Sequence, residues 1–291
     1  MELRYPKLQT MAYSNILLDL CHKARNSHEN IIIFDLSKTE FITPFGIILL
    51  SGTISECLAS QKSAKYRKPH NGKTKNFLSG IGFNNFFKIG GDNHKIESPN
   101  VQLKRIDSID YLLTDNILEI FQESIRMSDG VEGSLKMALN ELMTNAFDHS
   151  NSSKGCYVCA QTYKQAKTIR LCIADFGVGI LNSLNKVNAY RDLTQDNEAI
   201  KLSVQEGVTS RIGKYAGYGL THINRFIEAN KGTMHIISGK GKVVWTYSGV
   251  KKRKDQDQTM YCPFQGTIIN LTINAHKEGF YFLQSSEGEI F

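Results

Sequence analysis

The sequence lacks any long uninterrupted hydrophobic run. Its most apolar window, residues 41–57, is broken by Thr43, Pro44, Ser51 and Thr53, so no membrane span is expected. No apolar run follows the polar N-terminus, which predicts that the chain carries no signal peptide. These two absences exclude membrane and secreted classes and favour a cytoplasmic protein.

The sequence also lacks a cysteine framework. Cys156 and Cys159 form a CxxC within a predicted strand, where their odd separation places the two sulfurs on opposite faces. No second cysteine pair is present to complete a zinc site. The six cysteines are therefore predicted to be free buried thiols, as in a reducing cytoplasm.

Strong charge of one sign is absent as well. The net charge of +7 is mild for 291 residues, and 41% hydrophobic with 22% charged residues is typical of a soluble globular protein. This length allows about two domains. The only long basic stretch, residues 62–75, has no acidic residue; a phosphate-binding patch and a solvated loop both explain it, and the loop is the favoured interpretation.

The first hundred residues predict an alternating αβ unit. An amphipathic helix over 8–25 precedes a buried strand over 31–36 and a turn over 41–46, and a helix over 47–59 packs back on the strand. The strand, turn and helix over 33–50, and Phe77–Phe87, resemble STAS domains, the fold of anti-sigma-factor antagonists. STAS regulators usually carry a phosphorylatable Ser before the turn glycine, but Phe45 stands before Gly46. The resemblance therefore implies a docking or scaffolding role.

The second half is organised around a helix with two stripes. One stripe is apolar and a neighbouring one carries Glu141, Asn145 and Asp148 at helical spacing. An amide oxygen is a hard ligand for magnesium, and a carboxylate can orient a water. The apolar stripe consists of Leu135, Ala138, Leu139, Leu142 and Ala146.

Two glycine motifs follow this helix. Strands are predicted over 155–163 and 168–174, and the second alternates as a half-buried antiparallel strand does. It runs into Asp175, followed by Gly177 and Gly179, which allow close approach of a flat ligand. Gly217 and Gly219 then precede a helix that begins near Leu220, where free N–H groups favour an anion. Strands over 233–238, 242–247 and 266–273 close the chain.

Glu141 with Asn145, the Asp175 motif and the Gly217 motif occur in the order typical of the GHKL ATPase superfamily, which residues 105–275 resemble. This superfamily includes histidine kinases, anti-sigma serine kinases and the B subunit of gyrase. The resemblance implies an α/β (α+β) chain: a STAS-like αβ domain over 1–100, a Bergerat-fold α/β sandwich over 101–275 and a tail over 276–291. The implied ligands are ATP and Mg²⁺.

The resemblance also assigns roles. Glu141 matches the catalytic Glu that acts on water, Asn145 the magnesium ligand, and Asp175 the Asp that accepts a hydrogen bond from the adenine amino group. The other implied ATP-binding residues are Gly177, Gly179, Arg211, Lys214, Gly217, Gly219, Leu220 and Thr267. Asp148 replaces the usual Lys or Arg of histidine kinases, and His149 follows as in anti-sigma serine kinases.

Two activities are compatible with these residues. The first is a regulator that binds Mg-ATP and hydrolyses it slowly to switch a protein partner; the second is a serine/threonine kinase of the anti-sigma type. No helix carries a convincing phosphoacceptor His, which argues against a sensor histidine kinase. A binding module without chemistry is disfavoured by Glu141. The resemblance further implies a homodimer, and neither a membrane nor a nucleic-acid partner is expected.

Residues 181–216 correspond to the ATP lid in this comparison, and Arg211 and Lys214 are its candidate cations for the β- and γ-phosphates. Replacing both with Ala should weaken ATP binding far more than ADP binding, because ADP lacks the γ-phosphate. Equilibrium titrations with each nucleotide measure this difference. An equal loss for both nucleotides would contradict the assignment.

Overall fold

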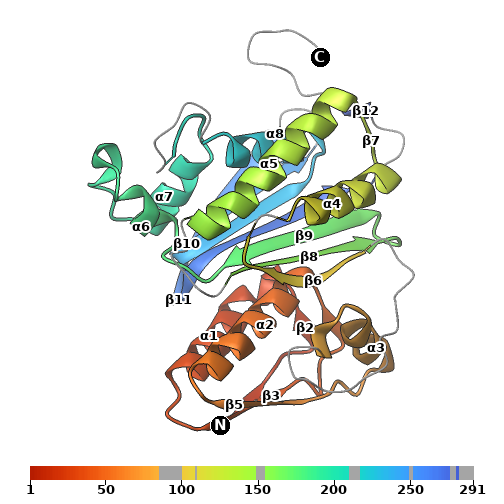
Figure 1. Cartoon of the computed structure of the whole chain (residues 1–291), viewed down its shortest axis with the longest axis vertical. Coiled ribbons are helices and arrows are strands. Elements are labelled where there is room, and N and C mark those ends of the chain that lie inside the picture. The colour runs from red at the N-terminus through yellow and green to blue at the C-terminus, as the bar shows by residue number, and fades with distance from the viewer. Residues whose placement is uncertain are drawn as a thin grey trace.

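The computed structural model describes residues 1–84, 100–108, 110–148, 155–209, 217–248, 252–275 and 280–281. The chain is a mixed α/β protein in which sheets and groups of helices are stacked on one another (Figure 1). A small sheet and two helices from the N-terminal part lie beneath a larger sheet, and further helices cover the upper face of that sheet. None of the described helices combines the length and apolar character needed to cross a bilayer.

Residues 1–84, here called the N-terminal layer, contain a parallel three-stranded sheet in the order β1-β3-β5. The predicted strand over 31–36 is confirmed as Ile31–Asp35, which pairs in parallel with a strand on each side. The strands are β1 (Glu2–Arg4), β2 (Leu8–Gln9), β3 (Ile31–Asp35), β4 (Phe41–Ile42) and β5 (Ser63–Arg67), with β2 paired to β4. The helices are η1 (Met11–Tyr13), α1 (Ser14–Asn26), α2 (Pro44–Ala59) and α3 (Gly72–Gly80).

Three predictions for this layer were wrong in detail. The first helix begins at Ser14 because Leu8–Gln9 pairs as a strand. Helix α2 starts at Pro44, three residues before the predicted start, since proline is well suited to a first helical turn. The basic stretch is not one loop: Ser63–Arg67 adds an edge strand to the sheet, and Asn71 caps α3 through the Thr74 N–H.

The second half forms a five-stranded sheet in the order β10-β11-β9-β8-β6, with every neighbouring pair antiparallel. The antiparallel prediction for the strand after residue 168 is confirmed. The strands are β6 (Asn100–Ile106), β8 (Cys156–Tyr163), β9 (Thr168–Asp175), β10 (Thr233–Ser248) and β11 (Lys252–Asn274). A separate parallel pair joins β7 (Arg126–Met127) to β12 (Phe280–Tyr281).

Helices α4 (Tyr111–Ser124), α5 (Asp129–Asp148) and α8 (Gly219–Ala229) cover the upper face of this sheet. Between β9 and α8 the chain forms α6 (Ile180–Leu184), η3 (Asn188–Tyr190) and α7 (Asp196–Ser203). Asp129 and Gly130 are the first residues of α5, and the short strand β7 separates α5 from α4.

The C-terminal strands differ most from the prediction. Gly239 and Gly241 were expected to join two strands, but β10 runs through them, with register shifts against β11 at both glycines. Glycine inside a strand often marks such a β-bulge. The two glycines therefore bend one continuous strand and do not form a turn between two strands. Strand β11 begins at Lys252, well before the predicted start at Gly266. It pairs with β10 from Lys252 to Thr272, and its residues 267–274 also pair with β9.

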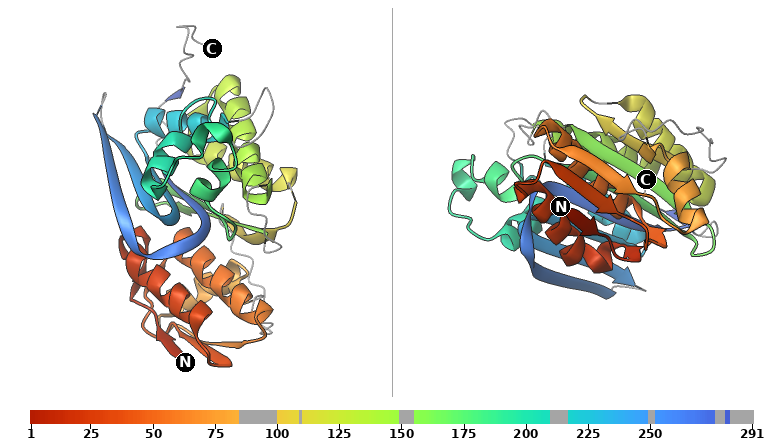
Figure 2. Two further views of the ribbon diagram at one scale, coloured as in Figure 1. Left: turned by 90° about the vertical axis from the view of Figure 1, so that its left-hand side faces the viewer. Right: turned by 90° about the horizontal axis from the view of Figure 1, so that it is seen from below.

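Both faces of the five-stranded sheet are buried. Its upper face shares a core with α4, α5 and α8, whereas its lower face shares a core with α1 and α2 of the N-terminal layer. Cys156 belongs to the upper core and Cys159 to the lower one, which confirms that the CxxC sulfurs lie on opposite faces. All six cysteines are free, as predicted, but only five are buried; Cys262 is partly exposed. Figure 2 shows α1 and α2 lying directly beneath the sheet.

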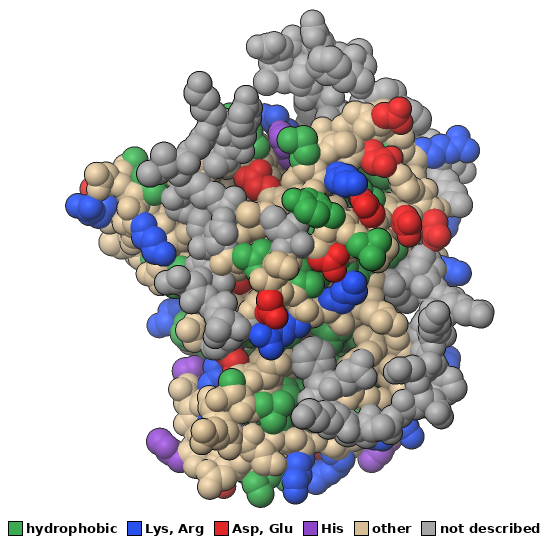
Figure 3. All heavy atoms as spheres, viewed as in Figure 1, with side chains coloured by type: hydrophobic (Ala, Val, Ile, Leu, Met, Phe, Trp, Pro, Cys, Tyr) green, Lys and Arg blue, Asp and Glu red, His purple; other side chains and the backbone are tan. Residues whose placement is uncertain are grey.

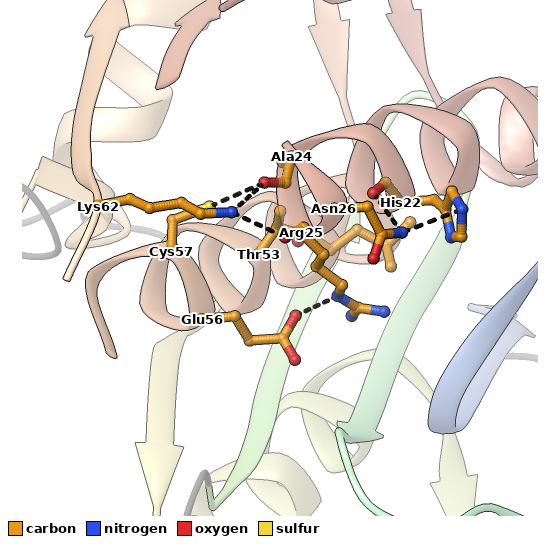
Figure 4. A network of polar contacts seen from close by, with 9 residues as sticks. His22, Ala24, Arg25, Asn26, Thr53, Glu56, Cys57 and Lys62 are labelled. Atoms are coloured by element: carbon orange, nitrogen blue, oxygen red, sulfur yellow. Dashed lines mark hydrogen bonds and ion pairs between the residues drawn. The ribbon is translucent and has the colours of Figure 1, made fainter. Parts of the chain in front are cut away.

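A largely buried ion pair lies where the N-terminal layer meets the sheet. Arg25 of α1 donates from Nε to the Glu56 carboxylate of α2, and the side chains are 16% and 8% exposed (Figure 4). The Arg25 guanidinium also lies over the rings of Phe176 and Phe264, 5.7 Å from each centroid. Arg25 therefore connects α1, α2 and the underside of the sheet.

Replacing Arg25 with Ala should lower the free energy of unfolding by about 3–5 kcal/mol, because it removes the positive charge beside the largely buried Glu56 carboxylate. Arg4→Ala in the same layer is the matched control. The Arg4 side chain is 79% exposed, and its removal should change stability by less than about 0.5 kcal/mol. Urea unfolding measures both, and equal effects would contradict the importance of the buried pair.

Candidate functional site

Helix α5 presents two side chains of different chemistry beside its buried stripe. The stripe is buried as predicted, with exposures from 0% at Leu139 to 5% at Ala146. Glu141 and Asn145 are only partly buried and lie one helical turn apart, on the neighbouring face. Both line a cavity that lies above the sheet. The side chain of Asp148, the third polar residue of the predicted face, lies outside the described atoms.

The cavity brings together residues from five separate segments of the chain. Helix α5, the end of β9 with the following α6, residues 203–209, the start of α8 and strand β11 each contribute to its wall. The predicted site residues that line it are Glu141, Asn145, Asp175, Gly179, Gly217, Leu220 and Thr267. Two further predicted residues adjoin the cavity. Gly177 hydrogen-bonds the Asp175 carboxylate, and Gly219 packs against the Glu141 side chain.

Asp175 is the buried charge of this cavity. It is the last residue of β9 and is 7% exposed, and the Gly177 N–H donates to its Oδ1 over 2.8 Å. Thr267 is its register partner on β11 and also hydrogen-bonds it. Burial outweighs these hydrogen bonds and raises the pKa of Asp175 from its ordinary 3.8 to about 7.

Two glycines give this end of the cavity its shape. Gly179 has a φ of +80°, and Gly266 has a φ of +117°. A Cβ at Gly266 would lie 2.1 Å from the Asp175 carbonyl oxygen, so no other residue fits there without moving β9. Ser238 of β10 joins the segment after Asp175 to β11. Its Oγ accepts a hydrogen bond from the Ile180 N–H over 2.8 Å and donates one to the Gly266 carbonyl over 3.0 Å.

Glu141 connects α5 to the start of α8. Its Oε1 accepts from the backbone N–H groups of Gly217 and Tyr218, over 3.0 and 3.1 Å. These N–H groups were predicted to stay free for an anion, but here a carboxylate occupies that position. Gly219 permits the approach, because a Cβ there would lie 2.8 Å from the Glu141 Cβ. The start of α8 thus binds a carboxylate group, in keeping with its helix dipole.

Some predicted residues cannot be placed. Arg211, Lys214 and His149 lie outside the described residues. Arg191, another basic residue of the predicted lid, donates to Asn188 in η3 and is absent from the described cavity wall. In the part of the chain that the structure describes, no group of three His, Cys, Asp or Glu residues could hold a metal ion. Glu141 and Asn145 contribute hard oxygen ligands to the α5 wall of the cavity.

Several isoleucine and leucine side chains of the cavity wall and Ser238 were not predicted as site residues from the sequence. Ile173 lies two residues before Asp175 and Ile269 two residues after Thr267, so each shares a strand face with a predicted site residue. That period of two could have identified them. Ile180 and Leu184 of α6 also line the cavity, yet no local signal distinguishes them from core residues. Ser238 gave no signal because its contacts depend on the bend of β10.

Comparison with known proteins adds no assignment. No family model matches the chain, and no curated protein matches it.

The raised pKa of Asp175 predicts a pH dependence of stability. Between about pH 4 and pH 7 the folded state holds a proton that the unfolded state has lost, so stability falls as pH rises through this window. Asp175→Asn has no such proton and should show a smaller loss. Urea unfolding of both proteins at pH 5 and pH 8 measures the difference. Identical losses in the two proteins would show that Asp175 ionises normally.

Proposed function

We propose that the chain binds Mg-ATP in this cavity and hydrolyses it slowly to switch a protein partner. One observation carries the proposal: residues from motifs far apart in the sequence line a single cavity. Glu141 and Asn145 come from one segment, Asp175 from a second and Gly217 from a third. The GHKL resemblance predicts that these motifs share one nucleotide site.

The Asp175 end of the cavity fits an adenine ring. Ile173, Ile269 and Leu184 provide apolar walls for a flat ring. Asp175 is buried among them with its carboxylate under a desolvation penalty. An amino group donating to this carboxylate would stabilise its charged form and offset part of that penalty. Adenine carries such an amino group, so its burial would satisfy both the apolar wall and the buried acid.

The other end of the cavity fits phosphates and magnesium. The amide oxygen of Asn145 is the proposed ligand for Mg²⁺, which prefers oxygen ligands. The start of α8 already holds one anionic group, the Glu141 carboxylate. A phosphate could use the same N–H groups, which would leave Glu141 available to orient a water. Bound magnesium would offset phosphate charge during transfer.

The partner is proposed to be a protein. The face over α4 and α5 carries exposed carboxylates, among them Glu119, Glu123 and Asp129, which would repel a nucleic-acid backbone (Figure 3). The same helices expose Tyr111 and Leu112 by 62% and 66%, an apolar area of the kind that protein partners cover. The STAS resemblance of the N-terminal layer adds a second proposed docking element.

Incubation with γ-labelled ATP and magnesium tests the activity. The native protein should release labelled phosphate, and Glu141→Gln should release at least about a hundredfold less while ATP binding stays within a few-fold. Asn145→Ala should lose the magnesium-dependent part of ATP binding. Lys7→Ala is the control: its side chain is 69% exposed and pairs only with Glu40 in the described contacts.

Three outcomes separate the alternatives. Phosphate release that Glu141→Gln abolishes supports a hydrolysing switch. Transfer of label onto a protein from an extract, without free phosphate, would instead assign the serine/threonine kinase activity. A native protein that binds no ATP would contradict both.

A further inference from the structure

One aromatic side chain, Phe176, lies between the N-terminal layer and the end of β9 that carries Asp175. Phe176 directly follows Asp175, but the two side chains lie on opposite sides of the sheet. Asp175 lines the cavity above, whereas Phe176 belongs to the lower core that α1 and α2 share. Phe176 is 1% exposed and meets the rings of Tyr157 and Phe264 edge-on, each with centroids 5.3 Å apart.

Helix α2 is shaped to receive this ring. Gly52 lies in the middle of α2, and a Cβ there would be only 1.8 Å from Cζ of Phe176. Glycine inside a helix costs about 1 kcal/mol relative to alanine, so the close contact is obtained at the expense of helix propensity. Figure 4 shows Arg25 and Glu56 joining α1 to α2. The Arg25 guanidinium lies over the Phe176 ring, 5.7 Å from its centroid.

The contact continues into the cavity through the backbone. The Gly177 N–H, one residue beyond Phe176, donates to the Asp175 carboxylate. A displacement of the Phe176 ring must therefore change either the path of residues 175–177 or the position of α2. Because the lower core is closely packed, neither change is free of cost.

We propose that Phe176 is a positioning residue that couples docking of the N-terminal layer to the Asp175 end of the cavity. Docking of the N-terminal layer against the sheet would hold the Asp175 carboxylate in the position that binds the ligand. Bound ATP would in return stabilise the docked state, because such coupling is reciprocal. A partner that pulls on the N-terminal layer would thereby change ATP affinity. This coupling rests on the proposed function for its ligand, but its structural part can be tested alone.

The structural part is tested on the full chain without nucleotide. Gly52→Ala should speed amide hydrogen exchange at Gly177 by at least about tenfold, within the range of ordinary coupling energies. Adding Phe176→Leu, which removes the clashing ring atoms, should restore slow exchange. Gly72→Ala is the matched control, because a Cβ there meets nothing within 4 Å. Unchanged exchange in Gly52→Ala, or no rescue in the double variant, would overturn the coupling.

The same proteins are then titrated with Mg-ATP. Gly52→Ala should weaken binding about tenfold, and the double variant should recover to within about threefold of the native protein. Native affinity in Gly52→Ala would overturn the link to the nucleotide. A native protein that binds no ATP, with the exchange result intact, would overturn the proposed function and leave the structural coupling standing.

If Gly52→Ala does not fold, the native chain supplies the test. Mg-ATP should slow amide exchange within α2, which lies on the opposite side of the sheet from the cavity and packs against Phe176. No slowing in α2 alongside protection at Gly177 would overturn the coupling.

Discussion

Strand β9 is buried on both faces, and the rest of the molecule depends on this constraint. Ile169, Leu171 and Ile173 lie in the upper core, and Cys172 and Ala174 lie in the lower one. A strand covered on one side only could slide or twist at its end. Here the helices above and the N-terminal layer below fix the position where β9 ends, and that position carries Asp175.

Burial at this position disfavours the charged form of the Asp175 carboxylate, and this desolvation determines which ligand groups the cavity favours. Asp175 receives hydrogen bonds from Gly177 and Thr267, yet burial still favours its neutral form up to about pH 7. A ligand that brings an N–H donor lowers that cost, whereas an apolar ligand does not. At the opposite end, Glu141 satisfies the first N–H groups of α8. The two ends therefore differ in what they favour: a hydrogen-bond donor at one and an anion at the other.

Much of this arrangement could be predicted from local patterns. Glu141 and Asn145 are one turn apart, and glycines followed by a helix mark the start of α8, so their elements were recognised from spacing alone. In contrast, the burial of the second face of β9 was not predicted from the sequence. The even positions of β9 include Arg170 and two small residues, Cys172 and Ala174, which resemble a solvated face until α2 is seen to cover them. The apolar character of α2 all round its axis was the available signal, since such a helix is buried on several sides.

The remaining misses arose where tertiary contacts override local propensity. Gly239 and Gly241 suggested a turn between two strands, because glycine is common both in turns and in β-bulges. Only the pairing with β11 shows that the strand continues. Likewise, the N–H groups at the start of α8 were expected to be free because Glu141 is distant in sequence. Its role as their acceptor depends on how α5 packs against α8, which local spacing does not encode.

The proposed function depends on recognition of adenine at the Asp175 end of the cavity. Calorimetric titration of the full chain with Mg-ATP and, separately, with Mg-GTP measures this recognition. ATP should bind at least about tenfold more tightly, because guanine presents an oxygen where adenine presents the amino group that would donate to Asp175. Equal binding of the two nucleotides, or no binding of either, would contradict it.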